Sequence, residues 1–293
     1  MSSGTPLATP TSLETVILSG RADASGLPVR VVVAPARGGM VTRFDVGDRP
    51  VLFLDAATLS DVTKNVRGGI PVLFPSPGPL AGDRFARAGK VGSMKQHGFA
   101  RQEAWSVIAK TGREATLELA SNDATRAQYP WEFVARIRYA LAGTMLTVAT
   151  RIENRGDAPM PFALGFHPYF YVPDAEKSRA RIDTDATRGF DNVTKTMVDV
   201  LGPIDLTQKE VDLHLADHTP RSATLVCGDR ARIVVSGDPE LRRWVVWTLA
   251  GKDFVCLEPW TAAADALNTG EGLLTVAPGE AKTVTMTIAH AAG

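Results

Sequence analysis

The amino-acid sequence predicts an all-β fold, either a sandwich or a barrel. Short runs of alternating apolar and polar residues recur along the chain, and turn signals rich in glycine and proline separate them. Side chains of a strand point alternately to its two faces, so a period of two indicates a strand with one buried face. Few windows show the helical period of about 3.6 residues. Many short strands between turns are typical of sandwiches and barrels.

The clearest pattern lies in residues 131–152, which we interpret as a β-hairpin. Apolar side chains beginning with Trp131 and Phe133 occupy one face of the first run, and mostly charged residues occupy the other. The run 145–152 also alternates, and Gly143 stands between the two runs. A glycine between two alternating runs is a typical hairpin signal.

The same alternation predicts the remaining strands. The C-terminal run 283–288 has threonines on one face and apolar side chains on the other, and it follows a turn signal at 277–279. Further strands are expected at 13–19, 29–34, 40–46, 51–54, 105–110, 114–120, 180–184, 223–227, 231–236, 243–250 and 254–257. We find no internal repeat, so we expect one domain over residues 13–293 after a flexible N-terminal segment, 1–12.

The composition argues against several classes of partner. Lys plus Arg and Asp plus Glu both number 32, so the net charge is zero and neither nucleic acid nor a membrane surface is expected as a partner. Two cysteines, Cys227 and Cys256, do not make a disulfide framework and favour a reduced compartment. Cys256 lies in an apolar run and is expected to be buried. With no signal-peptide pattern and no apolar stretch of about 20 residues, a cytoplasmic protein is expected.

Three irregular stretches interrupt the strand pattern, at 64–101, 160–174 and 256–272. Long loops in a compact β domain are uncommon unless they serve a function. Each stretch gathers glycine, proline, aromatic and ionisable residues, and we therefore expect a functional site there. The ionisable and aromatic candidates in these stretches are Arg67, His97, Arg101, His167, Glu258 and Trp260.

Each candidate taken alone also has an ordinary structural explanation. The two histidines could be satisfied in a turn and in the core, the two arginines could be solvated loop charges, and the tryptophan could be core. Glu258 could pair with an arginine. It ends an apolar strand-like run, however, and a carboxylate in such a place needs a partner or a purpose.

Several common chemistries lack their residues. Glycoside hydrolysis usually needs two acids, and only one carboxylate stands out here. The sequence has no Gly-x-Ser-x-Gly, His-Glu-x-x-His or Cys-x-x-Cys motif, and Gly68-Gly69 lacks the spacing of a nucleotide-binding loop. What remains is proton transfer between an imidazole and a carboxylate, with arginines to hold an oxygen-rich ligand and a tryptophan to stack on it.

These segments resemble the aldose 1-epimerase family, also called galactose mutarotases. The resemblance rests on RGGIPVLFP at 67–75, HGFAR at 97–101, GFHPYF at 165–170, and LEPWT at 257–261 followed by DALNTG, in the order that the family uses. It runs from about residue 28 to 288. It implies a large antiparallel β-sandwich of the supersandwich type. It also implies the interconversion of α and β anomers of an aldose without a cofactor. We expect no metal at the site, and the sequence leaves a structural metal open.

The resemblance also implies roles for individual residues. His167 would protonate the ring oxygen as general acid, and Glu258 would take the proton of the C1 hydroxyl as general base. Burial beside an apolar wall such as Trp260 would raise the pKa of Glu258 and make it a better base. The residues expected to bind substrate are Arg67, His97, Arg101, Asp212 and Trp260. The match at Asp212 is short, and a loop charge is an almost equal alternative.

The sequence leaves the sugar open. Basic residues crowd one stretch that holds a single acid, Asp83; they are Lys64, Arg67, Arg84, Arg87, Lys90, Lys95 and Arg101. One branch of the family acts on hexose 6-phosphates and holds the phosphate with arginines, whose forked donors suit it. GFHPYF departs from the simpler motif of that branch, so free and phosphorylated hexoses both stay open.

Two other classes of function also stay open. The fold could serve as a non-catalytic sugar-binding or sugar-sensing module, although a pure binder needs neither an acid nor a base. A structural β-sandwich with accidental motifs would have to explain four matches in order. The oligomeric state is not determined by the sequence.

Overall fold

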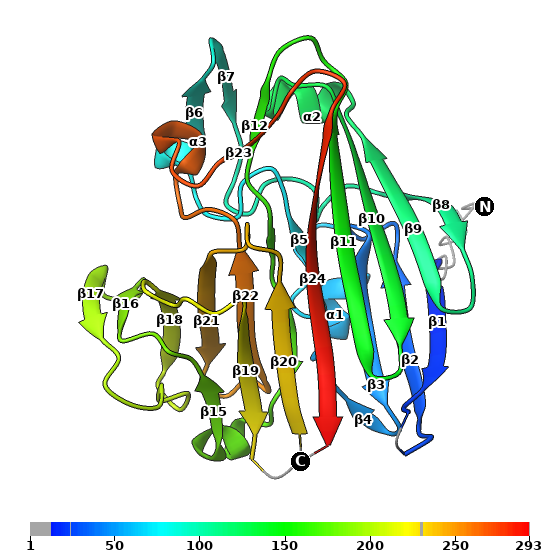
Figure 1. Cartoon of the computed structure of the whole chain (residues 1–293), viewed down its shortest axis with the longest axis vertical. Helices are drawn as coiled ribbons and strands as arrows, with labels where there is room; N and C mark the ends of the chain where they lie inside the picture. The colour runs from blue at the N-terminus through cyan, green and yellow to red at the C-terminus, as the bar shows by residue number, and fades with distance from the viewer. Residues whose placement is uncertain (1–12, 24, 229–230, 293) are drawn as a thin grey trace, which may run out of the picture.

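The computed structural model describes residues 13–23, 25–228 and 231–292, and it is dominated by antiparallel strands (Figure 1). The all-β prediction is confirmed, with two eight-stranded sheets and three smaller ones. The expected flexible segment 1–12 lies outside the described residues. No helix in the described ranges is both long and apolar enough to cross a membrane.

The first eight-stranded sheet has the order β15-β19-β20-β24-β11-β10-β9-β8. Its strands are β8 (Ser106–Lys110), β9 (Glu114–Ala120), β10 (Phe133–Ala142), β11 (Met145–Asn154), β15 (Ala180–Asp183), β19 (Ser222–Cys227), β20 (Ala231–Gly237) and β24 (Ala281–Ala292). The predicted hairpin at 131–152 is β10 and β11, which pair along their whole length.

The second eight-stranded sheet has the order β17-β16-β18-β21-β22-β13-β5, with β14 also paired to β22. Its strands are β5 (Val72–Leu73), β13 (Gly165–Phe166), β14 (Tyr169–Tyr171), β16 (Arg188–Asp191), β17 (Thr196–Asp199), β18 (Glu210–Leu215), β21 (Arg243–Leu249) and β22 (Phe254–Trp260). This sheet carries most of the candidate site.

Smaller elements complete the fold. A four-stranded sheet contains β1 (Val16–Arg21), β2 (Pro28–Ala34), β3 (Met40–Val46) and β4 (Arg49–Pro50). Two strand pairs are β6 (Arg84–Arg87) with β7 (Lys90–Ser93), and β12 (Met160–Phe162) with β23 (Leu274–Val276). The helices are α1 (Ala56–Ser60), α2 (Asp123–Gln128), α3 (Ala266–Thr269), and the 3₁₀ turns η1 (Ala81–Asp83) and η2 (Asp174–Arg179).

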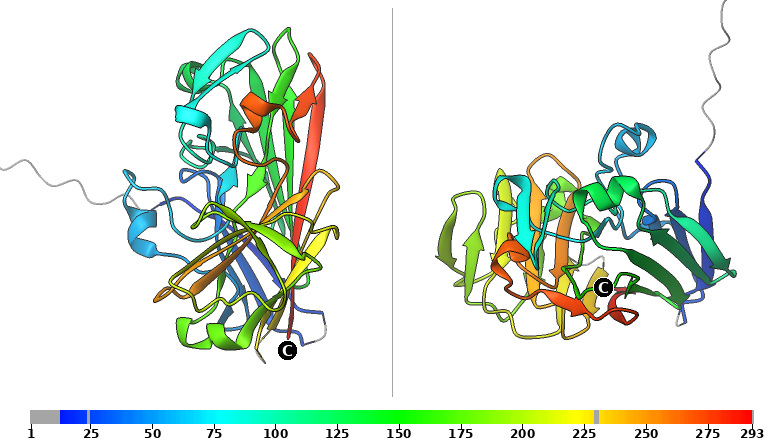
Figure 2. Two further views of the ribbon diagram at one scale, coloured as in Figure 1. Left: turned by 90° about the vertical axis from the view of Figure 1, so that its left-hand side faces the viewer. Right: turned by 90° about the horizontal axis from the view of Figure 1, so that it is seen from above.

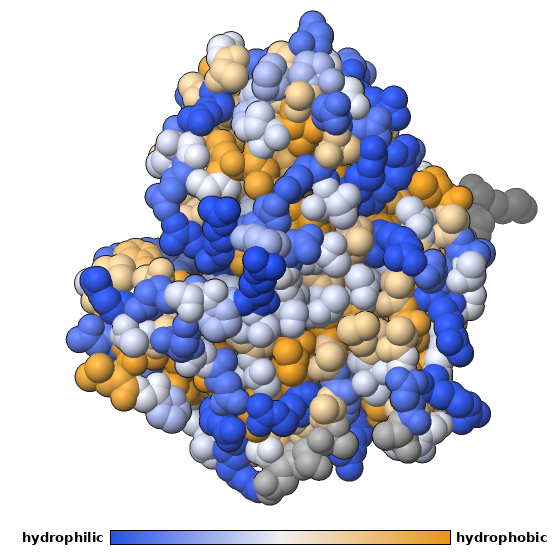
Figure 3. All heavy atoms as spheres, viewed as in Figure 1, coloured by the Kyte–Doolittle hydropathy of each residue, from blue (hydrophilic) through white to orange (hydrophobic). Residues whose placement is uncertain are grey.

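The two large sheets share one apolar core, and Figure 2 shows the strands arranged in layers. Val148 and Ile288 of the first sheet belong to the same buried cluster as Val246 and Leu257 of the second. Burial of apolar area is the main term that favours folding, and this cluster supplies much of it. The face in Figure 3 carries hydrophilic and hydrophobic side chains next to one another, as is usual for folded proteins, whose surface keeps much apolar area.

Some boundaries differ from those expected. The run 51–54 is not a strand, because it makes only isolated bridges, from Leu52 to Phe170 and from Leu54 to Gly68. The strand expected at 254–257 continues to Trp260, so Glu258 lies inside β22 and not at its end. The three irregular stretches contain short strands: β5–β7 in the first, β12–β14 in the second and the end of β22 in the third.

The segment 97–101 is fixed against the core through Phe74. The backbone N–H groups of Phe99 and Ala100 donate to Phe74 O at 3.1 and 3.2 Å. Gly98 has a φ of 66°, and a Cβ added to it would lie 2.2 Å from the same oxygen. Only glycine accepts this backbone and this approach, so Gly98 holds the preceding residue, His97, in place.

We predict that Gly98→Ala destabilises the fold by about 1–3 kcal/mol, because the new methyl group clashes with Phe74 O in a strained backbone. Urea unfolding measures this change. Gly112→Ala is the control, since a Cβ there meets nothing within 4 Å, and its midpoint should stay near wild type. Equal midpoints for the two variants would contradict the assignment.

Candidate active site

A cavity of about 610 Å³ brings all the residues singled out in the sequence together. Its lining includes Arg67, His97, Arg101, His167, Asp212, Glu258 and Trp260. These residues come from five separate parts of the chain. The cavity is therefore a tertiary feature, and its concave form with converging polar groups is typical of a small-molecule site.

Strand register explains why Glu258 and His167 meet. Gly165 pairs with Trp260 and Tyr169 pairs with Cys256, both antiparallel to β22. His167 is midway between Gly165 and Tyr169, and it therefore lies opposite Glu258, which is midway between Trp260 and Cys256. On the other side of β22, Val245 of β21 pairs with Glu258. The carboxylate is thus held between paired strands on both sides.

His167 and Glu258 form a close buried pair. Nδ1 of His167 lies 3.4 Å from Oε1 of Glu258, and the two residues are only 6% and 2% exposed. Oε2 of Glu258 accepts a hydrogen bond of 3.2 Å from Nε1 of Trp260. The His167 ring stacks on Tyr169 with centroids 4.6 Å apart and planes 6° apart. Stacking and hydrogen bonding fix both side chains in orientation.

Burial shifts the two pKa values toward each other. Desolvation, with Asp212 nearby, raises the pKa of Glu258 well above its ordinary value. Desolvation also lowers the pKa of His167 well below its ordinary value, helped by the nearby His97 and Arg101. Burial thus makes the carboxylate a stronger base and the imidazolium a stronger acid than either would be in water.

His97 is held as one tautomer. Its Nδ1 lies 2.6 Å from Pro77 O, and a carbonyl oxygen can only accept, so Nδ1 carries the hydrogen. Burial, with the charge of Arg101, lowers the pKa of His97 to about 4. The ring is thus neutral near pH 7, and its Nε2 is left with a lone pair that can accept a hydrogen bond.

Arg67 and Arg101 supply positive charge to the cavity. Neither guanidinium forms an ion pair within the residues that the structure describes, and Cζ of Arg67 lies 5.8 Å from the ring centroid of Trp247. Nη2 of Arg101 donates to Gln96 O at 3.2 Å, and its Nε is buried with no hydrogen-bond partner among the described atoms. These donors remain available to an anionic or oxygen-rich ligand.

Asp212 lies in β18 and not in a loop. Its Oδ2 accepts a hydrogen bond of 2.6 Å from Nδ2 of Asn192, and its Oδ1 is 3.4 Å from Nε2 of His214. Burial opposes ionisation, but these two partners outweigh it and keep the pKa of Asp212 below its ordinary value. The side chain is therefore an ionised acceptor facing the cavity.

Comparison with known proteins decides the family. The model of the family described as aldose 1-epimerase matches residues 29–289. The chain belongs to the aldose 1-epimerase family. It is therefore an isomerase that interconverts the anomers of an aldose, and the comparisons give no support to the non-catalytic module.

Individual relatives agree with this assignment. The chain is 27% identical over 276 residues to a Cenchrus ciliaris protein named "Putative glucose-6-phosphate 1-epimerase", covering 88% of this chain and 74% of the other. The solved structure of the Slr1438 protein from Synechocystis sp. PCC 6803 has a TM-score of 0.91 at 36% identity, covering 99% and 100%. A galactose mutarotase related enzyme from Lactobacillus acidophilus shares the fold, with a TM-score of 0.77 at 19% identity, covering 95% and 98%.

The cavity of this epimerase also contains residues that sequence reasoning did not select. They are Gln96, Tyr169, Asn192, His214, Arg243 and Trp247, among others. Tyr169 stood inside the GFHPYF motif, and His214 stands two positions after Asp212 on the same strand face, so both had a local signal. Arg243 and Asn192 had none, because only the pairing of β16, β18 and β21 brings them to the cavity.

We predict that Glu258→Gln stabilises the fold while it removes the carboxylate. The pKa of Glu258 is higher in the folded state than its ordinary value of 4.5, so the folded protein holds a proton that the unfolded chain releases. The stability of the wild type therefore falls as the pH rises from about 4.5 to the folded-state pKa. The variant lacks this loss, so its advantage in Tm should grow from acid to alkaline pH. A gain of about 1 kcal/mol would raise Tm by about 2–4 °C.

Glu210→Gln is the matched control for this experiment. Glu210 also accepts a hydrogen bond from an indole, that of Trp247 at 3.3 Å, but it is exposed to solvent. Its Tm difference from wild type should not grow with pH. If the Tm difference between Glu258→Gln and wild type also stayed constant with pH, it would contradict a buried Glu258 carboxyl with a raised pKa.

Proposed function

We propose that this epimerase acts on hexose 6-phosphates, with His167 and Glu258 as its proton-transferring pair. The observation that carries the proposal is the 3.4 Å approach of these two buried side chains in a cavity that also holds Arg67 and Arg101. A sugar needs one proton delivered and one removed, and a phosphate needs cationic donors. The cavity offers both.

Ring opening begins when Glu258 takes the proton from the C1 hydroxyl and His167 gives a proton to the ring oxygen. The C1–O5 bond breaks, and an aldehyde forms at C1. Rotation about C1–C2 exposes the other face of the aldehyde. The proton transfers then run backwards, and the ring closes as the other anomer.

This cycle needs only one proton on the pair. In opening, the proton passes from His167 to the sugar while Glu258 gains one; in closing, both transfers reverse. Burial makes the Glu258 carboxyl a weaker acid and the His167 imidazolium a stronger one, so it favours the opening step, in which His167 gives a proton and Glu258 takes one.

Three further residues would position the sugar. The lone pair on Nε2 of His97 would accept a hydrogen bond from one hydroxyl, and the carboxylate of Asp212 would accept from another. Trp260 would hold Oε2 of Glu258 and leave Oε1 for the C1 hydroxyl. Trp260 is only 3% exposed, so orientation of the base is a larger part of its role than stacking on the sugar.

The phosphate would bind between Arg67 and Arg101. Their two segments are joined, since Nε2 of Gln102 donates to Oδ1 of Asn65 at 2.9 Å. Both arginines line the cavity, and the relative from Cenchrus ciliaris is named for a glucose-6-phosphate substrate. Guanidinium groups suit phosphate because they donate two hydrogen bonds in a plane.

We predict that Glu258→Gln and His167→Asn each lower kcat for anomer interconversion by roughly 10²–10⁴, the usual contribution of one general acid or base. Polarimetry of freshly dissolved α anomers of glucose, galactose and a hexose 6-phosphate measures the rate above that in buffer. His290→Gln is the control, because His290 lines a different cavity. Wild-type rates in both site variants would remove the pair from the mechanism.

We predict that Arg67→Ala and Arg101→Ala each raise KM for the hexose 6-phosphate by roughly 10–100-fold, since a hydrogen bond to a charged group contributes about 1.5–3 kcal/mol. KM for the unphosphorylated hexose should change much less. Arg138→Ala is the control, because Arg138 is exposed and pairs with Glu114. Equal wild-type affinity for the free and phosphorylated sugars would contradict the phosphate site.

A further inference from the structure

We propose that His167, Cys256 and Glu258 together form a site for Zn²⁺ or a similar thiophilic divalent cation, and that the bound ion blocks proton transfer. One ligand atom from each residue lies within 4.8 Å of the other two, and all three residues are buried. In the ranges that the structure describes, this is the one such group of three. The inhibitory part rests on the proposed function; the binding part does not.

Strand geometry places the third ligand. Cys256 and Glu258 are two residues apart on β22, so their side chains point to the same face. Tyr169, which stacks on His167, pairs with Cys256. The sulfur therefore lies beside the pair rather than behind the sheet.

The spacing of the other two ligand atoms fits a tetrahedral ion. Bonds of about 2.1 Å along tetrahedral directions place two ligand atoms roughly 3.4 Å apart. Nδ1 of His167 and Oε1 of Glu258 are 3.4 Å apart. A zinc–sulfur bond of about 2.3 Å calls for a sulfur about 3.6 Å from each, so Sγ of Cys256 needs to approach by at most about 1.2 Å.

Each ligand atom is free to bind. Nδ1 of His167 is buried and has no hydrogen-bond partner among the described residues, and a buried polar atom without a partner is costly. Oε2 of Glu258 is used by Trp260, which leaves Oε1 facing His167. Cys256 is a free thiol.

The chemistry of the donors selects the ion. A thiolate, an imidazole and a carboxylate suit zinc, whereas magnesium and calcium prefer oxygen alone. When the ion binds, Cys256 loses its thiol proton to solvent and the proton carried by the His167–Glu258 pair also leaves, so a thiolate, a neutral imidazole and a carboxylate hold the ion. The two negative charges balance the ion. The positive charges of Arg67 and Arg101 lie near His167 and repel a cation, so we expect a lower affinity than that of a structural zinc site.

Occupancy would stop the reaction through Glu258. Trp260 holds one carboxylate oxygen, and the ion would bind the other, which is the oxygen assigned to the C1 hydroxyl; the bound ion would cover this oxygen and lower its basicity. His167 and Glu258 line the cavity, so an ion reaches them by the path of the substrate. The fourth coordination position would face the cavity, where water or a sugar hydroxyl can bind.

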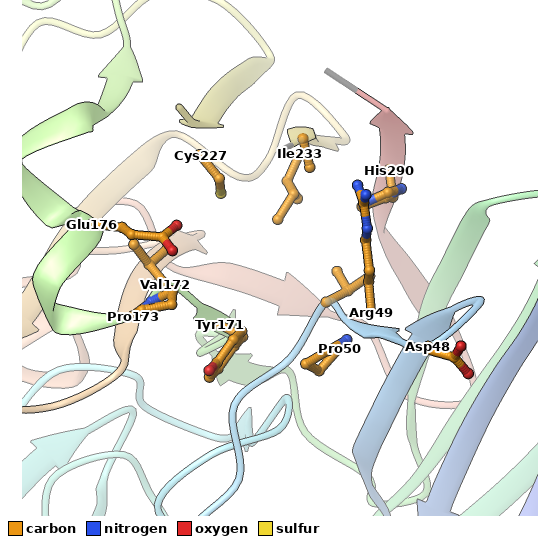
Figure 4. A pocket seen from close by; sticks show the side chains of 12 residues that line it. Asp48, Arg49, Pro50, Tyr171, Val172, Pro173, Glu176, Cys227, Ile233 and His290 are labelled. Carbon is orange, nitrogen blue, oxygen red and sulfur yellow. The ribbon is translucent and has the colours of Figure 1, made fainter. Parts of the chain in front are cut away.

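The chain offers a matched control in its other cysteine. Cys227 lines a separate cavity of about 280 Å³, together with Glu176 and His290 (Figure 4). These three come from β19, η2 and β24, and the figure shows them around that cavity. Cys227 is a buried cysteine that lines this separate cavity, outside the group of three, so its substitution is the matched control for that of Cys256.

The test is a titration of metal-stripped full-length protein with Co²⁺, whose thiolate-to-metal absorption reports a sulfur ligand, followed by displacement with Zn²⁺. Wild type and Cys227→Ala should bind one equivalent with this band. Cys256→Ala should lose the band and weaken binding by about 100-fold or more, because losing even an outer-sphere partner costs about 10–100-fold. Cys256→Ser is the second variant without the sulfur. Circular dichroism melts of Cys256→Ala and Cys256→Ser should show that both variants are folded.

Activity gives the second readout. Zn²⁺ should suppress anomer interconversion by wild type, a chelator should restore it, and Cys256→Ala should resist the ion. A band that persists in Cys256→Ala, a band that needs Cys227, or the lack of saturable binding by wild type would overturn the site. Binding without inhibition would overturn the blocking role. If the protein accelerated no sugar, the proposed function would fail, while the absorption titration would still decide the metal site.

Discussion

The burial of a carboxyl group beside an imidazole is the constraint on which the rest of the site depends. Water is nearly excluded from Glu258 and His167, so the charged form of each is disfavoured: the pKa of Glu258 is raised and that of His167 is lowered. Such a pair is unstable in isolation and needs a rigid surrounding. Paired strands on both sides of β22, the indole of Trp260 and the ring of Tyr169 supply it.

The residues around this pair differ in what they can do because their partners differ. His97 is fixed as a hydrogen-bond acceptor by Pro77 O, and Asp212 is fixed as an ionised acceptor by Asn192 and His214. Arg67 and Arg101 keep donors free. The cavity therefore offers both hydrogen-bond acceptors and cationic donors to a ligand.

Much of this arrangement could be predicted from the sequence, and the limits have physical causes. Alternation predicted the β10–β11 hairpin because its ten-residue strands are long enough to show a period of two. The two- and three-residue strands β5, β12 and β13 are too short to show any period. The motifs predicted His167 and Glu258 as an acid–base pair, but the apolar run that predicted the strand ends at Leu257, so its continuation to Trp260 was not predicted. Arg243 and Asn192 reach the cavity only through strand pairing, which no local pattern encodes.

The position of Glu258 inside β22 has a consequence for how the protein loses activity. Backbone pairs with β21 on one side and with β13 and β14 on the other mean that the base cannot move away without breaking the centre of a sheet. Elements of this kind open only with the whole molecule, whereas lids and loops open alone at small cost. Catalysis and global structure therefore belong to one cooperative unit. Loss of the base from its place therefore accompanies disruption of the sheet.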